Sequence, residues 1–319
     1  MKNTVNKENL EGRLYDFDLA KKTVQNKNSK YFGQEFWSGT IHIATDEAGL
    51  NVVPVHYTFV LPTFGNGKKD SRFAAFEKIT EEQKTWLKVG KDNAEMIKLS
   101  PSGGLNDFYS VNDDRMVSAQ RNEGGFITFV KELPEEGLSR NKFTYDMIIN
   151  KVALIEPKED NPDDVLRARI HGVIFNFKGD ILPWDVIAYN PKAIEYFENL
   201  GVSSKEPIYT QVWGSVRNTT VKVAKEVENA WGDPCVEYSD RPRREWVIEG
   251  SRPQFYEFSD EDAVELQKKV ADRNVYLAEV KANAIQYEQS RKAAAPAPMA
   301  TPVTSVIGGS IPDGDFNDF

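Results

Sequence analysis

The chain has 319 residues, enough to bury the cores of two domains of ordinary size. Its single cysteine, Cys235, excludes an internal disulfide framework and a cysteine-built zinc site. The net charge of −9 is atypical of a simple nucleic-acid binder, but residues 132–319 hold 22 basic and 32 acidic side chains, so the acidic excess lies there. Because phosphate affinity follows local patches, the total charge does not decide the matter.

Residues 1 to about 257 predict a mainly β fold. Short runs rich in β-branched and aromatic residues alternate in polarity and are separated by Gly, Asn, Asp and Pro. Two segments break this pattern. Arg72–Leu87 has apolar residues at helical spacing, and Pro191–Leu200 opens with proline and is followed by Gly201. The predicted strands are Leu10–Phe17, Phe36–Ile43, Val52–Phe59, Tyr145–Ile155, Val165–Phe177, Ile181–Tyr189, Ile208–Val216 and one near Trp246–Glu249.

The order of three strands, a helix and two further strands occurs twice. This is the order of a five-stranded Greek-key barrel of the OB type. We therefore expect tandem OB-like barrels over residues 1–137 and 138–258. Residues 91–130 look irregular, and Ser102-Gly103-Gly104 is typical of a flexible turn.

The C-terminal part predicts a helix, a linker and a tip. Ser259–Arg291 reads as one long helix with an apolar stripe, which either packs on the barrels or associates with another copy. Residues 292–310 are rich in Ala, Pro and small residues and predict a flexible linker. Residues 311–319, IPDGDFNDF, alternate carboxylates with phenylalanines, a composition suited to docking into a basic, apolar pocket of a partner.

This tip and the barrel order resemble the single-stranded-DNA-binding proteins of bacteria and phages. In that family, OB barrels precede a flexible linker and an acidic tip that ends in phenylalanine. The resemblance implies a docking role in replication, recombination and repair for Asp313, Asp315, Phe316, Asp318 and Phe319. The tip has fewer consecutive acids than the usual bacterial one and the body is longer, which favours a phage protein.

The predicted barrels also carry candidate DNA-binding residues. A single strand requires cations along its phosphates and aromatic faces for its bases. OB barrels provide both on strands 2 and 3 and on the loops between strands 1–2 and 4–5. The segment from Lys21 to Phe32 has no acidic residue. It provides the candidates Lys21, Lys22, Lys27, Lys30 and Tyr31, and Phe36 follows in the next strand.

Strand alternation sorts the remaining candidates. Trp37, Ile41 and Ile43 read as core, which places Phe36 on the outer face. In the second barrel Leu166, Ala168 and Ile170 read as core, and the outer candidates are Arg167, Arg169, His171, Tyr209, Trp213 and Arg217, with Lys222 and Lys225 in the loop that follows. The acidic loop Glu156–Asp164 would repel phosphate, so the first barrel is the stronger candidate.

Catalytic signatures are missing from the sequence. It contains no GxxxxGK[ST] loop, no GxSxG, and no GxGxxG after a strand, so we expect neither an enzyme nor a cofactor. No apolar run approaches the ~20 residues of a membrane span, and polar residues follow Met1, so we expect a cytoplasmic protein without a signal peptide, in the host cytoplasm if phage-encoded.

Two functions remain open. The first is sequence-independent binding and protection of single-stranded DNA, with recruitment of replication or recombination proteins through the tip. RNA is a subordinate alternative ligand, because stacking grooves accept either strand. The second is a structural or protein-interaction module, such as a virion component, that binds no nucleic acid.

Overall fold

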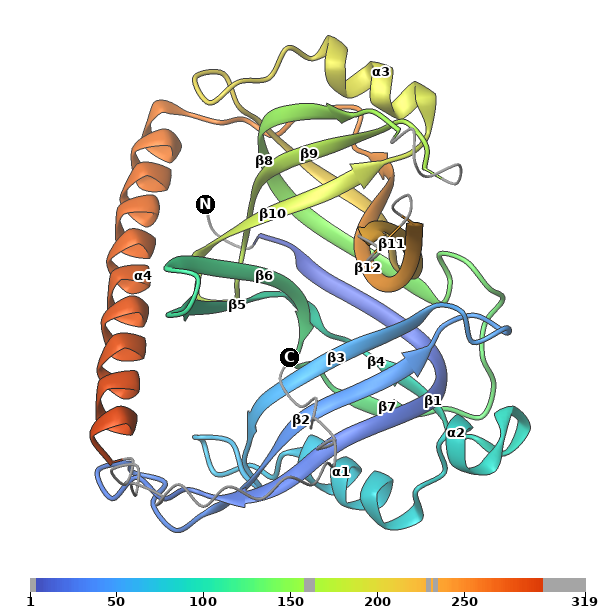
Figure 1. Ribbon diagram of the computed structural model, residues 1–319, viewed down its shortest axis with the longest axis vertical. Helices are drawn as coiled ribbons and strands as arrows, with labels where there is room; N and C mark the ends of the chain where they lie inside the picture. The colour runs from blue at the N-terminus through green and yellow to red at the C-terminus, as the bar shows by residue number, and fades with distance from the viewer. Residues whose placement is uncertain (1–3, 158–163, 228–230, 232–234, 295–319) are drawn as a thin grey trace.

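The computed structural model describes residues 4–157, 164–227, 231 and 235–294, and it is mainly β (Figure 1). In these residues three strands precede the first helix of each half, as the sequence predicts. The elements are β1 (Asn6–Thr23), β2 (Glu35–Ala44), β3 (Val52–Val60), α1 (Ser71–Glu82), α2 (Trp86–Val89), the 3-10 helix η1 (Lys91–Asn93), β4 (Met96–Leu99), β5 (Ser102–Ser110), β6 (Arg115–Glu123), β7 (Ile127–Phe129), β8 (Asn141–Ile155), β9 (Arg167–Phe175), β10 (Ile181–Ala188), α3 (Pro191–Asn199), β11 (Ile208–Val227), β12 (Cys235–Ser251) and α4 (Asp260–Ala294).

The second half forms a closed five-stranded barrel, here called barrel 2 (β8–β12). Strands β8, β9 and β10 form an antiparallel meander, and α3 leads from it to β11. Strand β12 pairs antiparallel with β11 and parallel with β10, at Ile187 and Val247. Strand β11 returns to β8, with Val212 opposite Tyr145, which closes the ring. This is the predicted OB strand order.

The first half, barrel 1 (β1–β7), repeats this order with its last two strands broken. Strand 4 is split into β4 and β5, and strand 5 into β6 and β7. The end of β6 pairs parallel with β3, Val55 opposite Asn122, while β7 pairs antiparallel with β4 and β4 with β1. The predicted mainly β fold with tandem OB-like barrels is therefore confirmed.

The first strands of the two barrels join them into one sheet. Strand β1 pairs antiparallel with β8, from Asn6 opposite Tyr145 to Leu10 opposite Asn141. Glu8 is buried at this junction, where it accepts hydrogen bonds from Tyr145 and from Nε1 of Trp246, the latter at 3.1 Å. One apolar core cluster contains residues of both barrels, so the barrels pack as one body.

In each barrel, OB strands 4 and 5 form a hairpin that reaches the other barrel. These hairpins are β5–β6 in barrel 1 and β11–β12 in barrel 2. Nε2 of Gln120 on β6 donates to the carbonyl of Asp185 on β10 at 3.1 Å. In return, Nδ2 of Asn218 on β11 donates to the carbonyl of Val52 on β3 at 2.7 Å. The two hairpins therefore border the faces of strands 2 and 3, where an OB barrel binds its ligands.

The long helix α4 connects the barrels a second time, as Figure 1 shows along one side of the molecule. Its Leu266 packs on the outer cluster of barrel 2 around Phe175. Arg273 forms an ion pair with Asp107 on β5 of barrel 1, with 2.7 Å between Nη2 and Oδ1. The helix therefore packs on the barrels, the first of the two roles that the sequence left open. Among the described residues, none of the helices has the length and apolar character to cross a membrane.

Several local predictions were wrong. The helix predicted over 72–87 ends at Glu82, because Gln83 adopts a left-handed conformation with φ of 51°. Ser102–Gly104 lies in β5 and not in a turn. A Cβ on Gly103 would stand 2.9 Å from the Trp184 ring, so glycine permits this close packing. Leu166, predicted as core, is 41% exposed. The division into domains stays a prediction. Residues 292–294, predicted to open the linker, continue α4, and the rest of the linker and the tip lie outside the described residues.

Candidate nucleic-acid interface

The loop between β1 and β2 carries exposed lysines, but its start differs from the prediction. Lys21 and Lys22 lie in β1, which continues to Thr23, so only Lys27 and Lys30 lie in the loop proper. Lys21 lies 3.2 Å from both Glu35 and Glu77, and these hydrogen bonds raise its pKa. Among the described residues, Lys22, Lys27 and Lys30 have no carboxylate within ion-pair distance and stay available to an anion.

Three aromatic rings meet beside this loop; we call Tyr31, Phe36 and Phe59 the aromatic cluster. The ring centroids of Phe36 and Phe59 lie 4.6 Å apart, and those of Tyr31 and Phe59 lie 5.8 Å apart. Phe59 is 43% exposed, and Nζ of Lys30 lies 4.8 Å from the Tyr31 ring centroid. The cluster offers both a π-face and a cation at one place on the surface.

The sequence missed Phe59 because its strand breaks the alternation of faces. Val55 and Tyr57 are buried, as alternation predicts for their face. A register shift between β2 and β3 follows, at Trp37 and Gly39, so that Thr58 and Phe59 are both exposed. The core prediction for Trp37, Ile41 and Ile43 is confirmed, and Phe36 lies on the opposite, partly exposed face.

Two histidines continue this face toward barrel 2. Oγ1 of Thr40 lies 3.0 Å from Nδ1 of His56. Burial, assisted by the nearby guanidinium of Arg244, lowers the pKa of His56 to about 4. Burial also lowers the pKa of His42. Both imidazoles are therefore neutral at pH 7, and they can donate or accept hydrogen bonds but add no charge.

The corresponding face of barrel 2 is charge-balanced. Nδ1 of His171 lies 2.8 Å from Oδ1 of Asp185, and Nε of Arg169 lies 3.9 Å from the other oxygen of the same carboxylate. These two candidates share β9 and an outer face, as predicted, but both contact Asp185 on β10, whose carboxylate offsets the charge of Arg169. A strand entering here would meet the Asp185 carboxylate beside Arg169.

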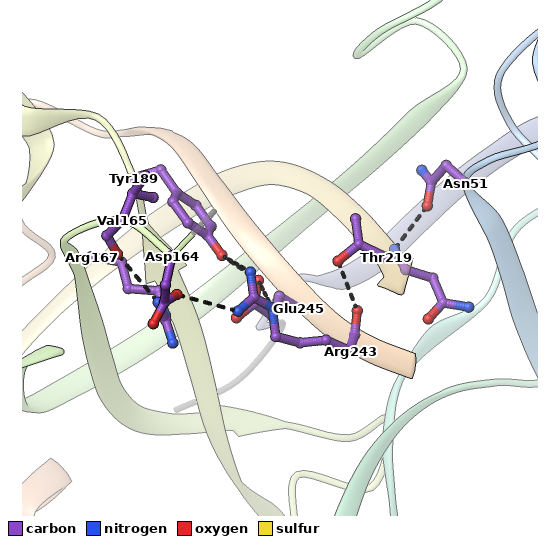
Figure 2. Close-up of polar contacts among 9 residues, drawn as sticks. Asn51, Asp164, Val165, Arg167, Tyr189, Thr219, Arg243 and Glu245 are labelled. Atoms are coloured by element: carbon purple, nitrogen blue, oxygen red, sulfur yellow. Dashed lines mark hydrogen bonds and ion pairs between the residues drawn. The ribbon is translucent and has the colours of Figure 1, made fainter. Parts of the chain in front are cut away.

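Arg167 belongs to a more enclosed polar network, which Figure 2 shows. Only 9% of the residue is exposed, and its guanidinium contacts the carboxylate of Asp164. Arg243 lies 3.7 Å from the same carboxylate and 3.4 Å from Glu245, and Tyr189 donates to Glu245 at 2.6 Å. Arg167 therefore stabilises the start of β9, and its charge is already paired.

Trp213 and Arg217 on β11 lie apart from the candidates on β9, whereas Tyr209 is opposite Ile148 on β8, which also pairs with Val173 on β9. Tyr209 packs against Tyr256, with ring centroids 4.7 Å apart, and Arg217 lies 3.8 Å from Glu249. Trp213 is opposite Thr144 on β8, whereas His171 is opposite Lys151, seven residues further along. At ~3.3 Å per residue these two side chains are more than 20 Å apart along the strand.

The remaining candidates lie in β11 and in the C-terminal tip. Lys222 and Lys225 are in β11 and not in a loop, so that part of the prediction was wrong; their side chains are outside the described set. The tip residues Asp313, Asp315, Phe316, Asp318 and Phe319 lie outside the described residues. Within the described ranges, no group of His, Cys, Asp and Glu side chains has the arrangement of a metal site.

Comparisons with known proteins place the chain in a family. The solved structures that are similar to it include two of the single-stranded DNA binding protein from Thermus aquaticus. A deletion mutant is 13% identical, with a TM-score of 0.45 and coverage of 82% of this chain and 100% of that one. The wild type is 12% identical, with a TM-score of 0.43 and coverage of 81% and 97%. A search of curated proteins finds no match. A family model described as YorF matches residues 5–283, and the chain therefore belongs to the YorF family.

Proposed function

We propose that this protein binds single-stranded DNA, without sequence preference, on barrel 1. The observation that carries the proposal is the aromatic cluster of Tyr31, Phe36 and Phe59 beside the exposed lysines of the β1–β2 loop. In a barrel with the OB strand order, this loop and the face of strands 2 and 3 form the usual ligand surface.

The chemistry of the cluster fits an unpaired strand. Each base has a π-face, and stacking on an aromatic side chain contributes roughly 1–3 kcal/mol per base. Lys22, Lys27 and Lys30 lie close in sequence to these rings and can follow the phosphates. A duplex hides its π-faces within the base stack, so the cluster favours single strands.

We also propose that the C-terminal tip recruits other proteins to the bound strand. Bound strands would be protected and presented to replication or recombination proteins. The carboxylates of Asp313, Asp315 and Asp318 and the rings of Phe316 and Phe319 would dock those proteins. The alternating acidic and aromatic composition of this tip is what supports such a role.

The test is fluorescence anisotropy of labelled oligo-dT at two salt concentrations, with duplex DNA and oligo-U as competitors. We expect the affinity to fall with salt. The logarithm of the binding constant should fall against the logarithm of the salt concentration with a slope of about −0.7 per phosphate contacted, and duplex DNA should not displace the labelled strand. Displacement by oligo-U as strong as by oligo-dT would assign RNA as an equal ligand. No binding even at low salt would contradict the proposal and favour a structural or interaction module.

A further inference from the structure

We infer that the DNA site continues from the aromatic cluster into the cavity between the barrels and α4, where Phe177 and Tyr276 contact further bases. The inference rests on the proposed function and extends it to residues outside barrel 1. It starts from a cavity of about 660 Å³ lined by β3, by the turn between β9 and β10, and by α4.

The cavity is continuous with the aromatic cluster. Phe59 is a member of the cluster and also lines the cavity, together with its neighbours from His56 to Val60. A strand stacked on Phe36 and Phe59 therefore lies at the cavity entrance. The next surface along this direction belongs to barrel 2 and α4.

Three elements each present an exposed ring to this cavity. Phe177, in the β9–β10 turn, is 93% exposed, Tyr276 on α4 is 48% exposed, and Phe59 on β3 is 43% exposed. Single exposed apolar residues are ordinary, but three exposed rings lining one cavity form a series of stacking faces. Lys178 adds a cation 5.6 Å from the Phe177 ring centroid.

The cations of the cavity wall are mostly engaged. Arg273 pairs with Asp107, Lys269 donates to the Gly179 carbonyl at 2.5 Å, and Arg72 pairs with Asp70 at 2.6 Å. The carboxylates of Glu123, Asp180 and Asp272 also line the cavity, which therefore contributes stacking faces and no net positive charge. This predicts that losing its rings lowers affinity without changing the salt dependence.

The ion pair between α4 and β5 positions Tyr276. Arg273 contacts both carboxylate oxygens of Asp107, at 2.7 and 3.3 Å, and the Ser118 hydroxyl at 3.2 Å. The side chains of Arg273 and Asp107 are only 11% and 6% exposed. Tyr276 follows Arg273 by three residues, so both lie on nearly the same face of the helix. The helix thereby holds its ring against the cavity.

The experiment compares Phe177→Ala, Tyr276→Ala and the double variant with wild type, using labelled oligo-dT of about 30 nucleotides, longer than one OB barrel occupies. We expect affinity to fall about fivefold or more per ring, with the salt slope unchanged. Tyr287→Ala is the matched control, since Tyr287 is on the same helix, is 70% exposed and does not line the cavity. Its affinity should equal that of wild type.

The outcomes separate this inference from the proposed function. If both single variants bind as wild type does, the cavity is not part of the site, while barrel 1 still is. If wild type itself does not bind oligo-dT, both proposals fall. Photocross-linking with 5-iododeoxyuridine oligonucleotides gives a second test that does not depend on affinity. Cross-links at Phe177 or Tyr276 support the inference, and cross-links confined to the aromatic cluster contradict it.

Discussion

The two barrels have the same strand order, but the faces of their strands 2 and 3 carry different side chains. In barrel 1 this face carries the aromatic cluster, with Phe36 and Phe59 at 4.6 Å. In barrel 2 the equivalent strands carry Arg169 and His171, both beside Asp185. The fold therefore provides two similar platforms that carry different side chains.

The first loops of the barrels differ in the same direction. The β1–β2 loop of barrel 1 has exposed Lys27 and Lys30 and no carboxylate. The loop between β8 and β9 spans the acidic residues 156–164, and its Asp164 holds Arg167 in an ion pair. The two barrels thus share a strand order but differ in the charge of their first loops.

Removing the aromatic cluster should have the largest effect on binding. We expect Tyr31→Ala and Phe36→Ala each to lower oligo-dT affinity by about 5–150-fold, because each removes a stacking face worth ~1–3 kcal/mol. Titration by anisotropy measures the loss. Tyr196→Ala on α3 of barrel 2, which is 38% exposed, is the control and should change nothing. Equal losses in the control would remove the distinction between the barrels.

Glu8 lies buried at the junction of the two barrels, so its titration reports on whether they stay packed together. Burial raises the pKa of Glu8 to about 7, against an ordinary value of 4.5. Between these pH values the folded protein holds a proton that the unfolded chain releases, so stability falls as pH rises through this window. Relative to Glu8→Gln, the free energy of unfolding of wild type should fall by on the order of 3 kcal/mol between about pH 4.5 and pH 8.

Chemical denaturation at several pH values measures this difference. Both barrels should unfold in one transition, because the buried carboxyl lies at the β1–β8 seam and accepts hydrogen bonds from Tyr145 and Trp246. Parallel pH profiles for wild type and Glu8→Gln would show that Glu8 is not protonated in the folded protein.

Asp185→Asn should leave barrel 2 with an unpaired cation on the face of its strands 2 and 3, as barrel 1 has near its aromatic cluster. Removing this carboxylate releases the charge of Arg169 and leaves His171 a polar partner. Oligo-dT affinity should rise about two- to fivefold at low salt, and the salt slope should steepen by about 0.7 for a new phosphate contact. An unchanged slope would mean that the strand does not reach this face.

The smallest effects concern single lysines of barrel 1. Lys30→Gln should reduce the salt slope by about 0.7, since the side chain has no carboxylate partner in the described structure and can bind a phosphate. Lys21→Gln is the matched control, because Glu35 and Glu77 already hold Lys21. If the two substitutions change the slope equally, the pairing seen in the structure does not determine phosphate contact.

Local pattern was enough to predict much of this fold. Alternation identified Trp37, Ile41 and Ile43 as core, and the proline before Lys192 and the glycine at 201 bounded α3. The stripe beginning at Leu266 predicted α4 within three residues at each end. These features depend on neighbours along the chain, and the sequence contains them directly.

The residues that were misplaced or missed depend mostly on partners far along the chain. Arg167 is buried because Asp164 and the distant Arg243 and Glu245 form one network around it. Phe59 is exposed because of a register shift against β2. No local periodicity shows either effect. Phe177 had a local signal, since it ends a predicted strand and is followed directly by Lys178-Gly179, a pair typical of a turn.

The most direct test of the central claim, that barrel 1 carries the DNA site, is amide hydrogen exchange with and without oligo-dT. We predict that the strand slows exchange in the loop over residues 24–34 and in the neighbouring parts of β2 and β3. Exchange in β9, from Arg167 to Phe175, should change little. Protection confined to β9 and β10, or absent from both barrels at saturating oligo-dT, would contradict the account.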